Sequence, residues 1–279
     1  MEAERTVVVA RGPSGEVRGH IDASRREPLG DDLSGVVPRE LVTLLRRCSQ
    51  VDVLAAPPLD SRAGLLPPDL AWRYRVGPVP PPEPTANLPK RRVVVANVET
   101  PRSLRLARLP SMEPVAEQTG AWVELEGAQA TPSRVLEAMT QATDIEVHAH
   151  GVVDRSLSDA TVIALAPEHD GRYALTAEAI RRVRLEGAPM VLLGACSAAR
   201  LPPLLHQTSS LPQAFVDAGA RAVFAATVDI PNSAGRFFQA VRERITAGAG
   251  PAQALREERQ RWLREERSAQ WVTRVLLYE

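Results

Sequence analysis

The sequence predicts an α/β protein in which a mainly parallel β-sheet is flanked by helices on both faces. Two observations lead to this fold class. Short strand patterns alternate with helix patterns from about residue 91 to residue 279, and this alternation is typical of parallel sheets. The strand pattern at 92–97 also contains consecutive valines, as expected for a strand that is covered on both faces.

The first part of the chain, 1–90, is interpreted as an N-terminal flanking segment that packs on the same domain. We expect a strand at 6–10, a loop at 11–37, a helix from Pro38 and a strand at 51–55. Residues 77–89 are dense in proline, which favours an extended polyproline conformation and indicates a connector. The remaining residues, 91–279, form the main domain.

The main domain has regular boundaries between its expected elements. Thr131 followed by Pro132, and Thr176 before an apolar pattern, are helix start signals, and Gly219 is a helix stop signal. The expected strands are 92–97, 121–125, 144–150, 161–166, 189–195, 221–228 and 270–278, and the expected helices are 109–119, 131–141, a helix from 176, 211–218, 233–247 and 251–267.

Composition excludes several classes of partner. The formal net charge is +0, so no field over the whole protein attracts nucleic acid or an anionic membrane. The longest nearly apolar run, 188–199, is too short to cross a bilayer. The N-terminal residues lack a secretory apolar region, and two cysteines do not form a disulfide framework. These features predict a cytoplasmic protein.

Two residues at predicted strand ends carry the chemistry. His150 ends the strand at 144–150 and Cys196 follows the strand at 189–195. The carboxyl ends of parallel strands are where sites assemble, and a thiolate–imidazolium pair is the nucleophile of a cysteine peptidase. Small neighbours, including Gly151, leave room for a substrate backbone, and the backbone N–H groups of Gly151 and Cys196 are candidates for an oxyanion hole.

Other readings of these residues remain open. A histidine at a strand end and a buried cysteine are each common without any function. His148 and His150 lie on one face of a continuous strand and can hold a metal, but neither His169 nor His206 follows a clear strand. The chain also lacks phosphate-binding, nucleophilic-serine and paired-cysteine motifs. We therefore expect no metal and no cofactor.

At this point the sequence resembles a known family, the CHAT domain, a caspase-like cysteine peptidase domain often found with tetratricopeptide repeats. The resemblance covers about 91–279. It is carried by Ala130-Thr131, Asp144 with His150-Gly151, Leu175-Thr-Ala-Glu, Val191-Leu-Leu-Gly-Ala-Cys-Ser, Phe215-Val-Asp-Ala-Gly, Ala252-Gln-Ala-Leu-Arg and Trp271 with Leu277-Tyr278. The resemblance implies a caspase-like sandwich.

The resemblance also implies an activity and a partner. His150 is then the general base and acid, Cys196 is the nucleophile, and the protein is a thiol protease that hydrolyses a protein or peptide substrate. Because the family is usually joined to a regulatory domain, we expect a regulatory partner such as a repeat-containing protein. The alternative is a catalytically silent interaction or scaffold module of the same fold.

The sequence departs from the family pattern near the expected substrate pocket. Glu146 stands where the family often has histidine, His148 where a small residue is usual, Val228 in place of a tryptophan and Asn232 in place of an aspartate. In register, Asp229 resembles the first aspartate of a stretch in separases, which cut after arginine.

A carboxylate at Asp229 is therefore a candidate to bind a P1 arginine. Asp154 and Asp159, after His150, are rival pocket acids. The competing interpretation is that Asp229 or Asn232 caps the helix that follows.

Overall fold

We describe the protein from a computed structural model, over residues 6–22, 33–76, 89–109, 121–154, 160–200, 210–266 and 268–279. These residues form one eight-stranded sheet, one three-stranded sheet and one two-stranded hairpin. In spatial order the large sheet contains β3 (Val51–Val53), β4 (Trp72–Tyr74), β13 (Val275–Tyr278), β12 (Ala222–Ala226), β11 (Met190–Gly194), β7 (Asp144–His148), β5 (Arg91–Val98) and β6 (Ala121–Gly127).

The strands of the large sheet run in two blocks. Strands β12, β11, β7, β5 and β6 are parallel to one another. Strand β13 is antiparallel to β12, and β4 and β3 continue parallel to β13. The five parallel strands therefore end at the same edge of the sheet, and the loops that follow them lie together there.

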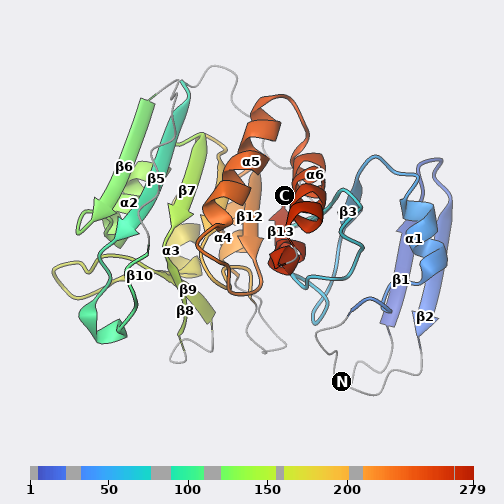
Figure 1. Ribbon diagram of the computed structural model, residues 1–279, viewed down its shortest axis with the longest axis horizontal. Coiled ribbons are helices and arrows are strands. Elements are labelled where there is room, and N and C mark those ends of the chain that lie inside the picture. Colours follow the sequence, from blue (N-terminus) through green and yellow to red (C-terminus); the bar gives the residue numbers. More distant parts are fainter. Residues whose placement is uncertain are drawn as a thin grey trace.

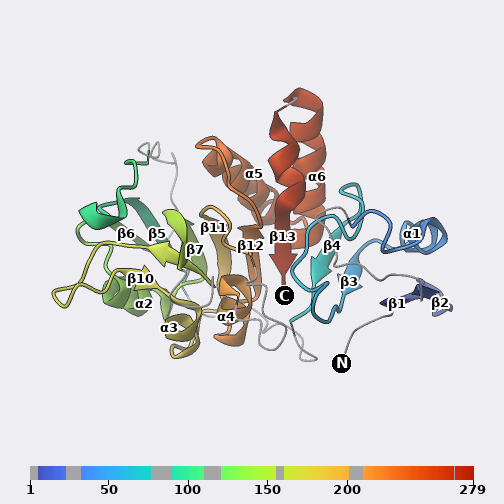
Figure 2. The same ribbon diagram turned by 90° about the horizontal axis from the view of Figure 1, so that it is seen from below.

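Helices cover both faces of this sheet, so the predicted fold class is confirmed (Figures 1 and 2). One face carries α5 (Ala234–Thr246) and α6 (Pro251–Glu265), which pack on each other. Figure 2 shows α2 (Pro132–Met139), α3 (Ala177–Arg181) and α4 (Leu211–Asp217) on the opposite face. The protein thus has three layers, with the sheet in the middle.

The alternation of side chains along the strands divides the interior into two apolar cores. On β11, Val191 and Leu193 face the core beneath α2, α3 and α4, whereas Met190 and Leu192 face the core beneath α5 and α6. On β7, Ile145 and Val147 face the first core. Because neighbouring residues of a strand point to opposite faces, the even-numbered residues of β7 point toward α5.

Two smaller elements lie outside the large sheet. Strands β8 (His150–Asp154), β9 (Ala160–Ala164) and β10 (Ala174–Leu175) form an antiparallel sheet. The hairpin of β1 (Thr6–Arg11) and β2 (Val17–Asp22) lies at the far end of the molecule beside α1 (Arg39–Leu45) (Figure 1). Its outer face exposes Val7, Val9, Val17 and Ile21 at 60–67%.

Most expected elements are present, and the differences are informative. Strand β2 replaces part of the loop expected at 11–37, and β4 was not predicted. Residues 269–274 form a 3-10 helix before the short strand β13, where the sequence predicted one strand from 270. Nearly all of the helix expected at 109–119 and of the connector expected at 77–89 lies outside the described residues.

The cap signals also have mixed outcomes. Thr176 accepts a hydrogen bond from the backbone N–H of Ala179 at 3.1 Å, and Gly219 adopts a φ of 112°, as a helix stop requires. Thr131 precedes α2 but makes no capping hydrogen bond through its side chain.

Within the described residues, no helix combines the length and apolar character needed to cross a membrane.

A buried arginine fastens the C-terminal segment to α6. Arg259 is 2% exposed, and its Nε donates to the carbonyl of Val272 at 3.2 Å while its Nη2 donates to the carbonyl of Val275. These two carbonyls lie where the chain passes from the 3-10 helix into β13. The side chain therefore satisfies backbone acceptors at a place where regular hydrogen bonding changes.

We predict that Arg259→Ala lowers the free energy of unfolding by about 3 kcal/mol or more, because it leaves two buried acceptors and a cavity. Urea denaturation measures this loss. Arg264→Ala, an exposed position of the same helix, is the matched control and should change stability by less than about 0.5 kcal/mol. Equal denaturation midpoints for the two variants would show that the Arg259 hydrogen bonds are unimportant.

Candidate active site

The strands that lead to the predicted histidine and cysteine are direct neighbours. Strands β7 and β11 are parallel, and His148 at the end of β7 pairs with Gly194 at the end of β11. Both chains leave the sheet at the same edge, so the residues that follow start from adjacent positions. This placement of the two strand ends is what the sequence predicted.

The position of His150 needs a correction. Strand β7 ends at His148, and His150 is the first residue of β8 in the other, antiparallel sheet. The chain changes direction at the buried Ala149, so His148 and His150 do not share the face of one continuous strand. Their rings have different partners: His148 contacts Glu146, and His150 contacts the carbonyl of Ala107.

A close backbone approach brings the His150 segment to Cys196. A Cβ atom added to Gly151 would lie 1.8 Å from the carbonyl oxygen and 3.2 Å from the backbone nitrogen of Cys196. Backbone atoms cannot move aside as the end of a flexible side chain can, so this position requires glycine. The residues after β7 and β11 are therefore packed directly on each other.

The ring of His150 is oriented by a loop after another parallel strand. Its Nε2 lies 2.7 Å from the carbonyl oxygen of Ala107, in the segment that follows β5 and the 3-10 helix Arg102–Leu104. A carbonyl group only accepts hydrogen bonds, so Nε2 carries the proton and donates it. In the neutral ring, Nδ1 then has a free lone pair and can act as a base.

The surroundings of Cys196 favour the neutral thiol over the thiolate. Burial raises the pKa of Cys196, the hydrogen bond to the Ile230 carbonyl lowers it, and the nearby carboxylate of Asp229 raises it again, with an upward net effect. The Sγ atom lies 3.9 Å from the Ile230 oxygen. Among the described groups that shift this pKa, there is no imidazole.

The residue after Cys196 is held in a rare conformation. Ser197 has a φ of 53°, its N–H donates to the carbonyl of Val228 at 2.9 Å, and its hydroxyl donates to Asp229 at 3.1 Å. The competing capping interpretation is not supported, because Ser233 precedes α5 and no side chain caps this helix. Asp229 instead anchors the turn that carries Cys196.

A buried ionic cluster lies beside the site on the α5 face. Glu146 is 1% exposed; it accepts hydrogen bonds from Nε2 of His148 at 2.6 Å and from Arg92. Burial alone would raise the pKa of Glu146, but His148 and the surrounding arginines lower it to about 2. The sequence analysis noted Glu146 only as a departure from a family pattern and did not predict this cluster.

A second carboxyl group in the cluster behaves in the opposite way. Burial raises the pKa of Asp144 to about 6 even though Arg242 and Arg92 act to lower it. Arg92 also lies over the ring of Trp122, 4.7 Å from its centroid. The α5 face of β5 and β7 is thus charged, while the opposite face of β7 is apolar.

The remaining predicted groups are placed only in part. The backbone of Asp154 ends β8, its side chain is outside the described part of the structure, and Asp159 lies outside the described residues. Groups of three or more histidine, cysteine, aspartate or glutamate side chains suited to a metal are absent from the described ranges.

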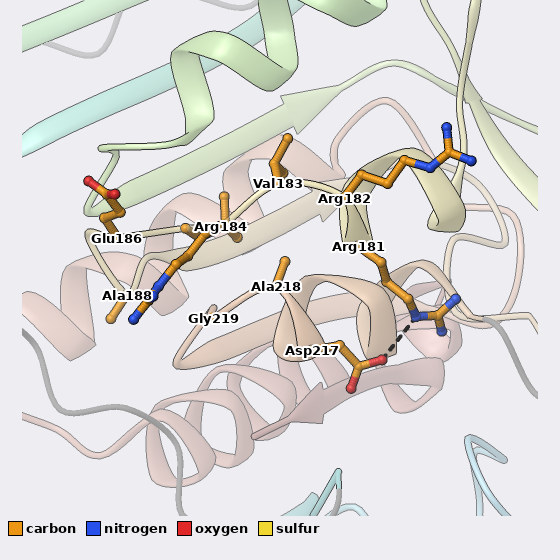
Figure 3. A pocket seen from close by; sticks show the side chains of 10 residues that line it. Arg181, Arg182, Val183, Arg184, Glu186, Ala188, Asp217, Ala218 and Gly219 are labelled. Carbon is orange, nitrogen blue, oxygen red and sulfur yellow. Dashed lines mark hydrogen bonds and ion pairs between the residues drawn. The ribbon is translucent and has the colours of Figure 1, made fainter.

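A hollow of about 830 Å³ lies at the opposite edge of the sheet. It is lined by the ends of α3 and α4 and the loop before β11 (Figure 3). Arg181 points to Asp217 and forms an ion pair at 3.0 Å, whereas Arg182 and Arg184 point in other directions (Figure 3). Because these guanidinium groups do not converge, the hollow does not form an anion site.

The family model of the CHAT domain matches residues 70–275. The chain belongs to the CHAT domain family. The match begins before β4, so it includes this strand and the block of five parallel strands, β12, β11, β7, β5 and β6. A comparison with curated proteins gives no match.

Solved structures similar to this CHAT domain share little sequence with it. The Arg specific cysteine proteinase gingipain R is 10% identical over 67% of this chain and 45% of that chain, with a TM-score of 0.41. Two structures of the Saccharomyces cerevisiae separase–securin complex are 10% and 12% identical over 76% of this chain and 14% of theirs, with TM-scores of 0.44 and 0.46. The chain spans less than half the length of each.

We predict that Cys196 of the free CHAT domain is alkylated slowly at pH 7 and that its rate rises with pH beyond about 8.5, the range of an ordinary thiol. The reason is the raised pKa of the buried thiol, because only the thiolate reacts. Iodoacetamide labelling in a Cys48→Ser background, followed by mass spectrometry, measures the rate. A rate that is already maximal at pH 6 would instead indicate an ion pair with an imidazolium.

Proposed function

We propose that this CHAT domain is a cysteine endopeptidase in which Cys196 is the nucleophile and His150 is the general base and acid. The observation that carries the proposal is the packing of Gly151 on the backbone of Cys196. It holds an imidazole-bearing residue next to a thiol-bearing residue at the carboxyl edge of a parallel sheet, where active sites assemble.

The orientation of His150 supports a definite proton path. Its Nε2–H donates to Ala107, so Nδ1 accepts the proton of the Cys196 thiol. The thiolate attacks the scissile carbonyl carbon, the C–N bond breaks, and the leaving amine takes the proton from His150. Water then attacks the thioester while His150 accepts its proton, and the released thiolate recovers it.

The backbone N–H groups of Gly151 and Cys196 are the proposed oxyanion donors. The two backbones are in direct contact, so a carbonyl oxygen placed beside Sγ is close to both. Donors that are already in place stabilise the negative charge of the tetrahedral intermediate without any rearrangement.

The raised pKa of Cys196 supports a second candidate function, a catalytically silent interaction module.

If the domain is a peptidase, it needs an activating step that brings Nδ1 of His150 to the thiol of Cys196. We propose that a regulatory protein partner, such as a repeat-containing protein, supplies this step.

Asp229 is the proposed P1 recognition residue. One of its oxygens accepts the Ser197 hydroxyl, and its charge is near enough to Sγ to raise the pKa of Cys196. A carboxylate at this position pairs with a P1 guanidinium through charge-assisted hydrogen bonds. Asp154 and Asp159 remain rival pocket acids.

We predict that His150→Ala lowers peptide cleavage by about 10² to 10⁴-fold, the usual contribution of a general base, and that Cys196→Ala abolishes it. Cleavage of a diverse peptide pool, mapped by mass spectrometry with and without cell extract as a source of activator, measures both effects. His169→Ala is the control, because His169 is exposed in a distant turn. Full cleavage by Cys196→Ala would refute the peptidase mechanism.

We predict that peptides with P1 arginine are cut best and that Asp229→Asn lowers their kcat/KM by about tenfold or more, since it removes the charge of a hydrogen-bonded pair. Asparagine still accepts the Ser197 hydrogen bond, so the turn around Cys196 is kept and iodoacetamide labelling should be little changed. Asp170→Asn, in an exposed turn, is the matched control. A cleavage map dominated by apolar or acidic P1 residues would contradict this assignment.

A further inference from the structure

The ring of His148 occupies space that a side chain at Gly194 would need, and it lies next to a second glycine, Gly235. A Cβ atom added to Gly194 would lie 2.8 Å from Nδ1 of His148, and one added to Gly235 would lie 3.5 Å from its Cε1. Gly194 belongs to β11 and Gly235 to the first turn of α5. The imidazole therefore fills the space between the sheet and α5, directly below the turn that carries Cys196.

The hydrogen bond to Glu146 defines which nitrogen of this ring is available. Nε2 donates to the buried carboxylate at 2.6 Å, and the pKa of Glu146 is lowered to about 2 by this contact and by arginine neighbours although burial opposes it. Glu146 is thus a pure acceptor, so Nε2 keeps its proton and Nδ1 is a lone-pair acceptor in the neutral ring. The described residues provide no hydrogen-bond donor to Nδ1.

The His148 ring lies beside the start of the turn that carries Cys196. It lies against Gly194, the last residue of β11, which precedes Cys196 by two residues. The segment after β12 contacts both groups: the carbonyl of Ile230 accepts from Sγ, and Gly235 lies beside the His148 ring. Asp229, which precedes Ile230 in this segment and acts on the thiol through its charge, and the ring of His148 therefore both border the surroundings of Cys196.

We infer that His148, oriented by Glu146, is a specificity-determining residue that selects a long P1 side chain with a hydrogen-bond donor at its tip, above all arginine. The inference rests on the proposed peptidase function and deepens it. In this arrangement Asp229 binds the positive charge of the P1 side chain close to Cys196. Nδ1 of His148 accepts a hydrogen bond only from a P1 side chain that is long enough to reach it. The His148 side chain is 12% exposed, so it is not fully enclosed by the sheet and α5, whereas its partner Glu146 is 1% exposed.

The length of the P1 side chain provides a test that needs no substitution. Peptidyl acyloxymethyl ketones with P1 arginine, with P1 2-amino-3-guanidinopropionic acid (the same guanidinium on a side chain two methylenes shorter) and with P1 leucine are compared for their rates of labelling Cys196. We expect the arginine reagent to be faster than the short analogue by about tenfold or more. Equal labelling rates for the arginine reagent and the short analogue would overturn the inference, because the charge of the P1 side chain alone would then determine the rate.

Substitution of the ring separates hydrogen bonding from packing. His148→Phe keeps a ring between the glycines but removes Nδ1, and should bring arginine and the short analogue to within about twofold of each other; His148→Asn offers an acceptor again and should restore part of the difference. Urea denaturation confirms that both variants fold. An unchanged arginine preference in folded His148→Phe would refute the role of the ring.

The same reagents separate this inference from the proposed function. If none of the three labels Cys196 with activator present while iodoacetamide still does, the peptidase proposal fails and the inference falls with it. If all three label Cys196 with no dependence on P1 length, the peptidase proposal stands and only the role of His148 is lost.

Discussion

The contact between Gly151 and the backbone of Cys196 is the constraint on which the site depends. An added Cβ would lie 1.8 Å from a carbonyl oxygen, so any other residue forces β8 and the end of β11 apart. Strand pairing brings the two chains only to neighbouring positions, whereas this contact joins the segments after they leave the sheet. A rigid backbone contact of this kind positions reacting groups more tightly than flexible side chains do.

The other loops of the carboxyl edge are held around this contact by hydrogen bonds. Ala107 after β5 orients His150, and Ile230 after β12 accepts from the thiol of Cys196. The four strands β5, β7, β11 and β12 are parallel neighbours, so the loops that follow them all lie at the same edge of the sheet. The parallel order of the sheet thus explains why residues far apart in sequence form one site.

Sequence patterns predicted this meeting point but not its details. His150 and Cys196 follow apolar strands, and the parallel arrangement follows from the alternation of elements. The end of β7 at His148 was missed because the alternating pattern continues through Ala149 and His150 without a turn residue. The raised pKa of Cys196 could not be predicted either, because it depends on burial of the thiol in the fold and on the charge of Asp229, which lies 33 positions further along the chain. Likewise, nothing near Glu146 in the sequence identifies Arg92 as its partner.

The buried charges beside the site are more than a consequence of the fold. Replacing a buried ion pair by packed apolar side chains often stabilises a protein, and the opposite face of β7 is built in this apolar way, with Ile145 and Val147. Glu146 nevertheless keeps a carboxylate at 1% exposure and bonds His148 and Arg92. Its distinctive effect is to fix the tautomer of His148, whose ring lies against Gly194, two residues before Cys196. A group that costs stability in the core is best explained by what it does at the adjacent surface, which is the recognition of a substrate side chain that we infer for His148.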